Sequence, residues 1–171
     1  MKVFIEEQRF TQLWLHILLV ISFVVSIVFV ANDWYTSDTT DSDAKRGFFI
    51  LLGSMLLVYG LIFSLKLKTR IDEKGIHYQF IPFHFSMKLI LWSDLEKAYV
   101  RKYDAISEYG GWGMKGGLFW RKSKGIAYNV NGDLGLQLEL KNGKKILIGT
   151  QKENEIKRIL RTYNTTNNDE T

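Results

Sequence analysis

Two long apolar stretches near the start of the chain limit what it can fold into. The first covers residues 13–31 and the second residues 48–65, and neither contains a formally charged side chain. As a helix rising 1.5 Å per residue, the first would be about 28 Å long, close to the thickness of a bilayer's hydrocarbon layer. Strands are rarely so long, and in lipid every backbone polar group must be satisfied within the segment. We therefore expect two membrane-spanning helices.

Two other interpretations of these stretches fit less well. A cleaved signal peptide has a shorter apolar core, and the run Phe29-Val30-Ala31 lacks the small residue expected two places before Ala31. The second stretch could instead be the core helix of a soluble domain. A helix that is apolar on every face is poorly suited to so short a chain, so we favour a span.

The charges around the two stretches predict their orientation. Through Leu65 the chain has four basic and six acidic residues, whereas from Lys66 onward it has nineteen basic and twelve acidic residues. Basic residues are retained in the cytoplasm, so the part after the second span is expected inside. Two spans then put both termini in the cytoplasm and the acidic loop outside, with Asp33, Asp38, Asp41 and Asp43. The predicted location is integral to the cell membrane, the inner membrane in a bacterium.

Small residues suggest how the two spans pack together. Ser22 and Ser26 lie four residues apart in the first span, and Gly53 and Gly60 lie two turns apart in the second. Small side chains allow close approach of helix backbones, which drives helix association in lipid. We expect these four residues at the contact between the helices.

After Lys66 the pattern changes to short apolar runs separated by turn signals, which is typical of a β domain. We assign residues 1–66 to the two spans and their loop, and residues 67–163 to a cytoplasmic β domain. Its seven predicted strands are residues 67–71, 76–81, 85–91, 97–103, 126–130, 134–140 and a return strand with Ile146 and Ile148. A partly open barrel capped by a C-terminal helix would bury the apolar faces of all these elements.

The end of the domain carries the clearest local signals. Four leucines alternate with other residues from Leu134 to Leu140, and Asn142-Gly143 then predicts a tight type I′ hairpin turn. Thr150 and Glu153 have the spacing of a helix capping box. The helix that follows has one apolar stripe, with Ile156, Ile159, Leu160 and Tyr163. Residues 164–171 are polar, and we expect a disordered tail there.

The stretches TRIDEKGIHYQF and LWSDLEKAYV, with the final hairpin and helix, resemble a bacterial pleckstrin-homology-like (PH-like) domain. The stretches EYGGWGMKGG and AYNVNGDLGLQLELKNGKKILIGTQKENEI resemble uncharacterised bacterial membrane proteins with two N-terminal spans, and the resemblance covers most of the chain. The resemblance implies a seven-stranded barrel capped by a helix, a binding or scaffolding role, and no catalytic residues. One departure is the first hairpin loop, residues 72–75, which is short and mostly acidic where phosphoinositide-binding PH domains carry basic residues.

Residues 109–132 combine glycines, aromatic rings and cations, and they contain no acidic residue. Aromatic rings prefer the membrane interface, and each cation near anionic lipid contributes on the order of 1 kcal/mol. The segment is therefore a candidate contact with the membrane or with a partner, through Trp112, Lys115, Phe119, Trp120, Arg121, Lys122 and Lys124. The alternative is a long hairpin packed on the barrel with its tryptophans in the core. The sequence leaves both interpretations open.

The sequence offers no recognisable catalytic or cofactor-binding arrangement. The absence of cysteine excludes disulfides, thiolate metal sites and cysteine nucleophiles. His77 and His84 are the only histidines of the β domain, and no further ligand or catalytic partner is apparent, so we expect no metal, no cofactor and no enzyme activity. The basic charge of the β domain follows from the membrane topology, so no nucleic-acid partner is needed to explain that charge.

We expect a membrane-anchored binding or scaffolding module. Its predicted partners are the lipid bilayer and a protein of unknown identity, and self-association is left open. The alternative is an accessory subunit of a larger membrane assembly, in which the two spans make the essential contacts.

Overall fold

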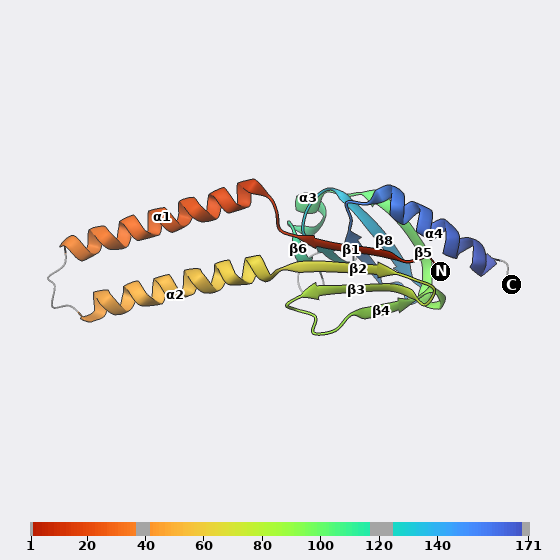
Figure 1. Ribbon diagram of the computed structural model, residues 1–171, viewed down its shortest axis with the longest axis horizontal. Coiled ribbons are helices and arrows are strands. Elements are labelled where there is room, and N and C mark those ends of the chain that lie inside the picture. Colours follow the sequence, from red (N-terminus) through yellow and green to blue (C-terminus); the bar gives the residue numbers. More distant parts are fainter. Residues whose placement is uncertain (1, 37–41, 117–124, 169–171) are drawn as a thin grey trace. The chain divides into compact units, whose positions relative to one another are not determined.

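The computed structural model describes residues 2–36, 42–116 and 125–168 (Figure 1). The chain divides into two compact units. One consists of Thr11–Ser64 and is helical. The other combines Met1–Phe10 with Leu65–Thr171 and contains the β-strands, and we call it the β domain.

The helical unit consists of α1 (Leu13–Thr36) and α2 (Ser42–Ser64). Both extend beyond the apolar stretches predicted from the sequence, into the polar residues that connect them. Within them, Leu13–Asn32 and Arg46–Ser64 are long and apolar enough to cross a membrane, and neither window is buried by the rest of the protein. Two long apolar helices followed by a β-rich domain with a C-terminal helix agree with the predicted fold class at this level of detail.

Larger side chains than those predicted make the contact between α1 and α2. The hydroxyl of Tyr59 donates a hydrogen bond to the carbonyl of Leu19, and the Tyr59 ring lies edge-on to Phe23 at 6.1 Å. His16 and Phe63 form a second ring contact at 5.5 Å. Aromatic pairs therefore set the spacing of the two helices.

The first sheet of the β domain begins with a strand that the sequence analysis missed. It is antiparallel throughout, in the order β1 (Phe4–Arg9), β2 (Lys66–Ile71), β3 (Gly75–Ile81) and β4 (Lys88–Leu91). The predicted boundary that gave residues 1–66 to the spans is therefore wrong at its start, because β1 belongs to the β domain. Its inward side chains include Glu6 and Gln8, which hid the apolar alternation of a buried strand.

The second sheet has the order β5-β8-β9-β7-β6. Its strands are β5 (Leu95–Lys102), β6 (Gly113–Lys115), β7 (Ile126–Asn129), β8 (Leu134–Leu140) and β9 (Lys145–Gly149). Only β7 and β9 run parallel; the other neighbours are antiparallel. The 3-10 turn Trp92–Asp94 precedes β5, and the short helix α3 (Ala105–Tyr109) follows it. The described residues thus form nine strands in two sheets, where seven strands in one barrel were predicted.

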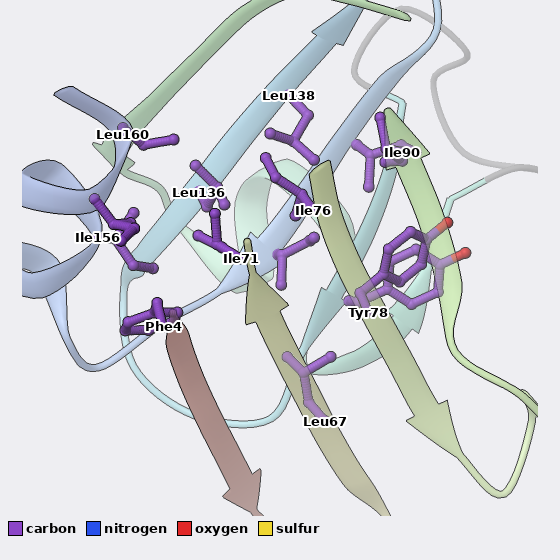
Figure 2. Close-up of a cluster of buried hydrophobic side chains, with 14 of the residues drawn as sticks. Phe4, Leu67, Ile71, Ile76, Tyr78, Ile90, Leu136, Leu138, Ile156 and Leu160 are labelled. Atoms are coloured by element: carbon purple, nitrogen blue, oxygen red, sulfur yellow. The ribbon is translucent and has the colours of Figure 1, made fainter. Parts of the chain in front are cut away.

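The main hydrophobic core lies between the two sheets and the C-terminal helix α4 (Glu153–Asn168). Figure 2 shows side chains from β1, β2 and β3 pointing toward Leu136 and Leu138 of β8 and toward Ile156 and Leu160 of α4. The predicted apolar stripe of α4 thus covers one side of the core. The helix continues to Asn168, past the predicted start of a disordered tail.

Two predicted local motifs differ in detail. The β8–β9 hairpin has a wider loop than a two-residue turn, because Leu140 N donates to Lys144 O at 2.9 Å and Gly143 N donates to Leu140 O at 2.8 Å. Gly143 has a positive φ of 79°, as in hairpins whose turn ends in a glycine bulge. Thr150 does not pair with Glu153: its hydroxyl donates to Glu6 at 2.8 Å and accepts from Lys152 N at 3.0 Å.

Candidate functional site

The strand register brings both connections to the helical unit to one end of the β domain. β1 ends at Arg9, just before α1, and β2 begins at Lys66, just after α2. Arg9 pairs with Lys66, and Lys66 pairs with Ile81 on the other side. We call the end of the β domain marked by these three residues the tether end.

The second sheet reaches the same end through a buried contact. The Gln8 side-chain amide donates to Gly149 O at 2.7 Å, next to Arg9. Gly149 ends β9, and the following Thr150 N donates to Leu134 O at 2.9 Å. Leu134 is also the register partner of Lys102, the last residue of β5. The helix α3, which follows β5, therefore lies at the tether end, as Figure 1 shows.

Polar contacts hold α3 firmly on β5. Asp104 caps the helix by accepting from the backbone N–H groups of Ile106 and Ser107 at 2.9 and 3.0 Å, and these bonds lower the pKa of its carboxyl group. Arg101 of β5 lies 2.9 Å from the Glu108 carboxylate. Burial acts to lower the pKa of Arg101, but the hydrogen bond to Glu108 and the nearby charges raise it overall. The guanidinium of Arg101 therefore stays charged and holds Glu108 of α3 against β5.

Trp112 is partly buried on the β domain. It lies against a small core of Tyr103, Ala105, Tyr109, Ala127 and Leu147, and its indole N–H donates to Gly132 O at 3.3 Å. Lys115 ends β6, is partly buried and pairs with Ala127 in the sheet. Both side chains are partly buried, and their contact with a membrane or a partner stays a prediction.

The other predicted residues of this site lie outside the described residues: Phe119, Trp120, Arg121, Lys122 and Lys124. Their contact with membrane or partner stays a prediction. The two glycines that flank residues 117–124 lie side by side, since a Cβ atom added to Gly116 would be 2.3 Å from Gly125 O. Gly116 also has a positive φ of 97°, so both its conformation and its close neighbour require glycine.

The tether end also carries an aromatic loop that the sequence analysis did not single out. The loop joins β3 to β4, and its Phe83 and Phe85 side chains are exposed, Phe85 completely so. The predicted strand over residues 85–91 begins later, at Lys88, and this leaves Phe85 in the loop. The available signal was the turn sequence Pro-Phe-His-Phe, since turns normally carry polar residues, not two phenylalanines.

The small residues proposed for helix packing are not brought together. Gly53 and Gly60 are exposed, and a Cβ atom added to either would meet nothing within 4 Å. Ser22 is exposed and Ser26 is partly buried, and the Ser26 hydroxyl donates to Ser22 O within the same helix at 2.8 Å. The small-residue prediction is therefore replaced by the contacts of Tyr59 and Phe63 described above.

The two histidines of the β domain have separate protein partners. His77 Nε2 is 3.1 Å from the Asp72 carboxylate, whereas His84 Nδ1 accepts from Phe80 N at 3.2 Å. Among the described residues, no group of three or more His, Asp or Glu side chains is placed to hold a metal ion. Comparison of the chain with protein-family models, curated proteins and solved structures finds no match.

Proposed function

We propose that the protein is a membrane-anchored, non-catalytic binding or scaffolding module whose β domain is held at the inner face of the cell membrane. The observation that carries the proposal is the pairing of β1 with β2. One strand precedes α1 and the other follows α2, so the β domain has two covalent connections at one end. If both helices cross the bilayer, this arrangement keeps that end of the domain at the membrane surface.

The same pairing supports the proposed orientation. Residues of β1 and β2 belong to one sheet, so the chain on both sides of the helix pair lies on one side of the membrane. Lys66, Lys68 and Arg70 directly follow α2, and a basic flank of this kind favours the cytoplasmic side. The acidic residues between the helices then lie outside.

We further propose that the β domain is PH-like. Two sheets packed face to face with an amphipathic C-terminal helix support this assignment. The additional strand β1 and the parallel pair of β7 and β9 depart from the simple seven-stranded arrangement. The first hairpin loop is closed by its own acidic residue, since Asp72 accepts from Lys74 N and from His77. We therefore do not place a phosphoinositide site there.

Single cysteines test the anchoring and the orientation, because the natural chain has none. We would compare Ser37→Cys, between the helices, with Ser107→Cys, which is exposed on α3. With a membrane-impermeant maleimide, intact cells should label the first variant, and only permeabilised cells should label the second. Labelling of Ser107→Cys in intact cells, or recovery of the chain without detergent, contradicts the proposal.

A photocrosslinker distinguishes the module from an accessory subunit. It would be attached at an exposed position on the β domain, Ile106, or on the helices, Leu57. A protein partner crosslinked from Ile106 supports the binding module. A stoichiometric partner crosslinked from Leu57 alone shows that the helices make the essential contact, as in a subunit of a larger assembly.

A further inference from the structure

The β3–β4 loop presents large apolar side chains to solvent. Phe85 is fully exposed, Phe83 is 51% exposed, and Met87 is also exposed. Most large apolar side chains of the β domain are buried between the sheets, as Phe80 is, only three residues before Phe83. Two exposed phenylalanines at the tip of one hairpin are an uncommon use of apolar surface and mark a contact site.

The loop lies beside the point where the chain leaves the helical unit. Ile81, the last residue of β3, is the register partner of Lys66, and Lys66 follows the end of α2 by two residues. Neighbouring strands are about 4.8 Å apart, so the loop starts one strand spacing from this connection. A membrane crossed by α2 would therefore lie within reach of Phe83 and Phe85.

The loop is held in a defined shape by the residue between the two phenylalanines. His84 is buried, and its backbone N–H donates to Phe80 O at 2.8 Å. Its ring packs at 5.8 Å from Tyr78 and 5.2 Å from Tyr128, and its carbonyl accepts from Gln79 at 3.0 Å. With His84 pointing inward, Phe85 is directed to the surface, and the half-exposed Phe83 ring is held by stacking on Phe80 at 6.0 Å. Such preorganisation reduces the entropy lost on binding.

The cations nearest the loop favour a lipid surface over other occupants. Lys88 begins β4 directly after the loop, Lys66 on β2 is the register partner of Ile81, and Ile106 of α3 is another exposed apolar side chain at the tether end. Aromatic rings prefer the interfacial layer of a bilayer, and nearby cations are attracted to anionic headgroups. An apolar tip between cations next to a membrane connection fits this layer.

We propose that the β3–β4 loop inserts Phe83 and Phe85 into the interfacial layer of the bilayer and gives the β domain a third, non-covalent attachment beside its two covalent connections. This inference rests on the proposed membrane anchoring. The lipid bilayer is then the binding partner of this loop, and the tether end of the β domain faces the bilayer.

Fluorescence quenching in vesicles tests the insertion with the full-length chain. Ser86→Cys, exposed in the loop, would carry an environment-sensitive fluorophore and leave both phenylalanines in place. In vesicles of phosphatidylcholine and phosphatidylglycerol, we expect quenching by lipids with a nitroxide near the headgroup, and protection from aqueous iodide. Phe83→Ser with Phe85→Ser should abolish both effects.

Matched positions make each failure interpretable. Ile5 is 66% exposed at the other end of β1, so Ile5→Ser in the Ser86→Cys background should leave the quenching unchanged. A fluorophore at Leu57→Cys in α2 should be quenched by lipids with a nitroxide deep in the acyl chain. If the fluorophore at Leu57→Cys is not quenched by these lipids, the membrane anchoring itself is contradicted.

If Leu57→Cys is quenched and Ser86→Cys remains open to iodide, only the loop insertion is overturned. Protection of labelled Ser86→Cys in detergent as well as in vesicles, together with disulfide-linked dimers of the unlabelled variant after oxidation, would show that the loop contacts a second copy of the chain. That outcome also overturns the insertion.

Discussion

The helical unit and the β domain use the same kinds of residue in opposite ways. In α1 and α2, large apolar side chains such as Val25, Phe29, Ile50 and Leu57 point outward and are exposed. In the β domain, Leu67, Ile71, Phe80 and Leu136 are fully buried. This difference is what two solvents would require, since apolar side chains would face lipid in helices that span a membrane and avoid water in a domain that does not.

The comparison also makes the exceptions informative. An exposed phenylalanine is ordinary in a helix that spans a membrane, as proposed for α1, but Phe85 is exposed in the β domain, at the tether end. The predictions below test how sharply the two units differ.

The largest expected effect separates a buried phenylalanine from a lipid-facing one. Phe80→Ala removes a fully buried ring from the core, and we expect it to destabilise the β domain by about 3–5 kcal/mol. Phe29→Ala removes a ring that is 76% exposed on α1, and the unfolding free energy of the β domain should change by less than about 0.5 kcal/mol. Chemical unfolding of the purified chain in detergent, followed by tryptophan fluorescence, measures both.

Equal destabilisation by the two phenylalanine variants would break the comparison. It would mean that α1 packs against protein at Phe29 and does not face lipid there.

The next effect concerns two neighbouring glutamates of β1. Glu6 is buried and accepts hydrogen bonds from the Thr150 hydroxyl at 2.8 Å and from Gln151 N at 2.9 Å. Glu6→Ala leaves both donors without this acceptor, so we expect a loss of about 1–3 kcal/mol in unfolding free energy. Glu7 forms surface ion pairs with Arg9 and Lys68, so Glu7→Ala should lower the unfolding free energy by less than about 1 kcal/mol.

The same unfolding experiment measures the two glutamate variants. If Glu6→Ala is as mild as Glu7→Ala, β1 does not contribute to the β domain, and the two units would have to be divided differently.

A smaller effect should depend on pH. Burial, and to a lesser extent the charge of Lys88, lowers the pKa of His84 below its ordinary value of about 6.5. The unfolded chain then binds the proton more readily than the folded chain, so this stability is fully present above about pH 6.5 and is lost as pH falls through the folded pKa. Melting temperature should fall from neutral to mildly acidic pH, and His84→Gln should reduce this dependence.

An unchanged pH dependence in His84→Gln would show that His84 is not the group responsible. The carboxylate of Asp72 does not account for the same pH range. Burial raises its pKa, but the hydrogen bonds from His77 and Lys74 N and the nearby charges lower it overall, so it is protonated only in stronger acid.

The smallest effect concerns the contact between the helices. Tyr59→Phe removes the hydroxyl that donates to Leu19 O, and such bonds in membranes contribute about 0.6 kcal/mol. Titration of the full chain from mild detergent into dodecyl sulfate, followed by helical content, would measure the change. Tyr35→Phe, at a position that is 90% exposed in α1, is the control and should leave the unfolding free energy unchanged. Equal effects of the two variants would argue against the contact.

The sequence was most informative where the local pattern and the solvent agree. The two apolar helices and the alternating leucines of β8 follow directly from periodicity, and all seven predicted strands have counterparts in the structure. β1 was missed because its inward residues Glu6 and Gln8 are polar. Their partners, Thr150 and Gly149, lie at the far end of the chain, where no local pattern reveals them.

The candidate site was harder to predict, because it depends on register and packing. Composition drew attention to Trp112, yet its ring packs on a small core formed by Tyr103 and by residues of α3, β7 and β9. The loop with Phe85 was taken as part of a strand, since the run up to Leu91 is rich in strand-forming residues. Only the register of Ile81 with Lys66 places that loop beside the connection to α2.

The position of β1 also sets an order of events during synthesis. β1 is made before either helix, yet its neighbour β2 and its buried partner Thr150 are made after both. If α1 and α2 cross the bilayer, the first strand must remain on the ribosome's side of the membrane until both helices have been inserted. If the second helix did not cross back, β1 would lie on the opposite side of the bilayer from β2 and Thr150. The first sheet could then form only after both helices had been inserted correctly.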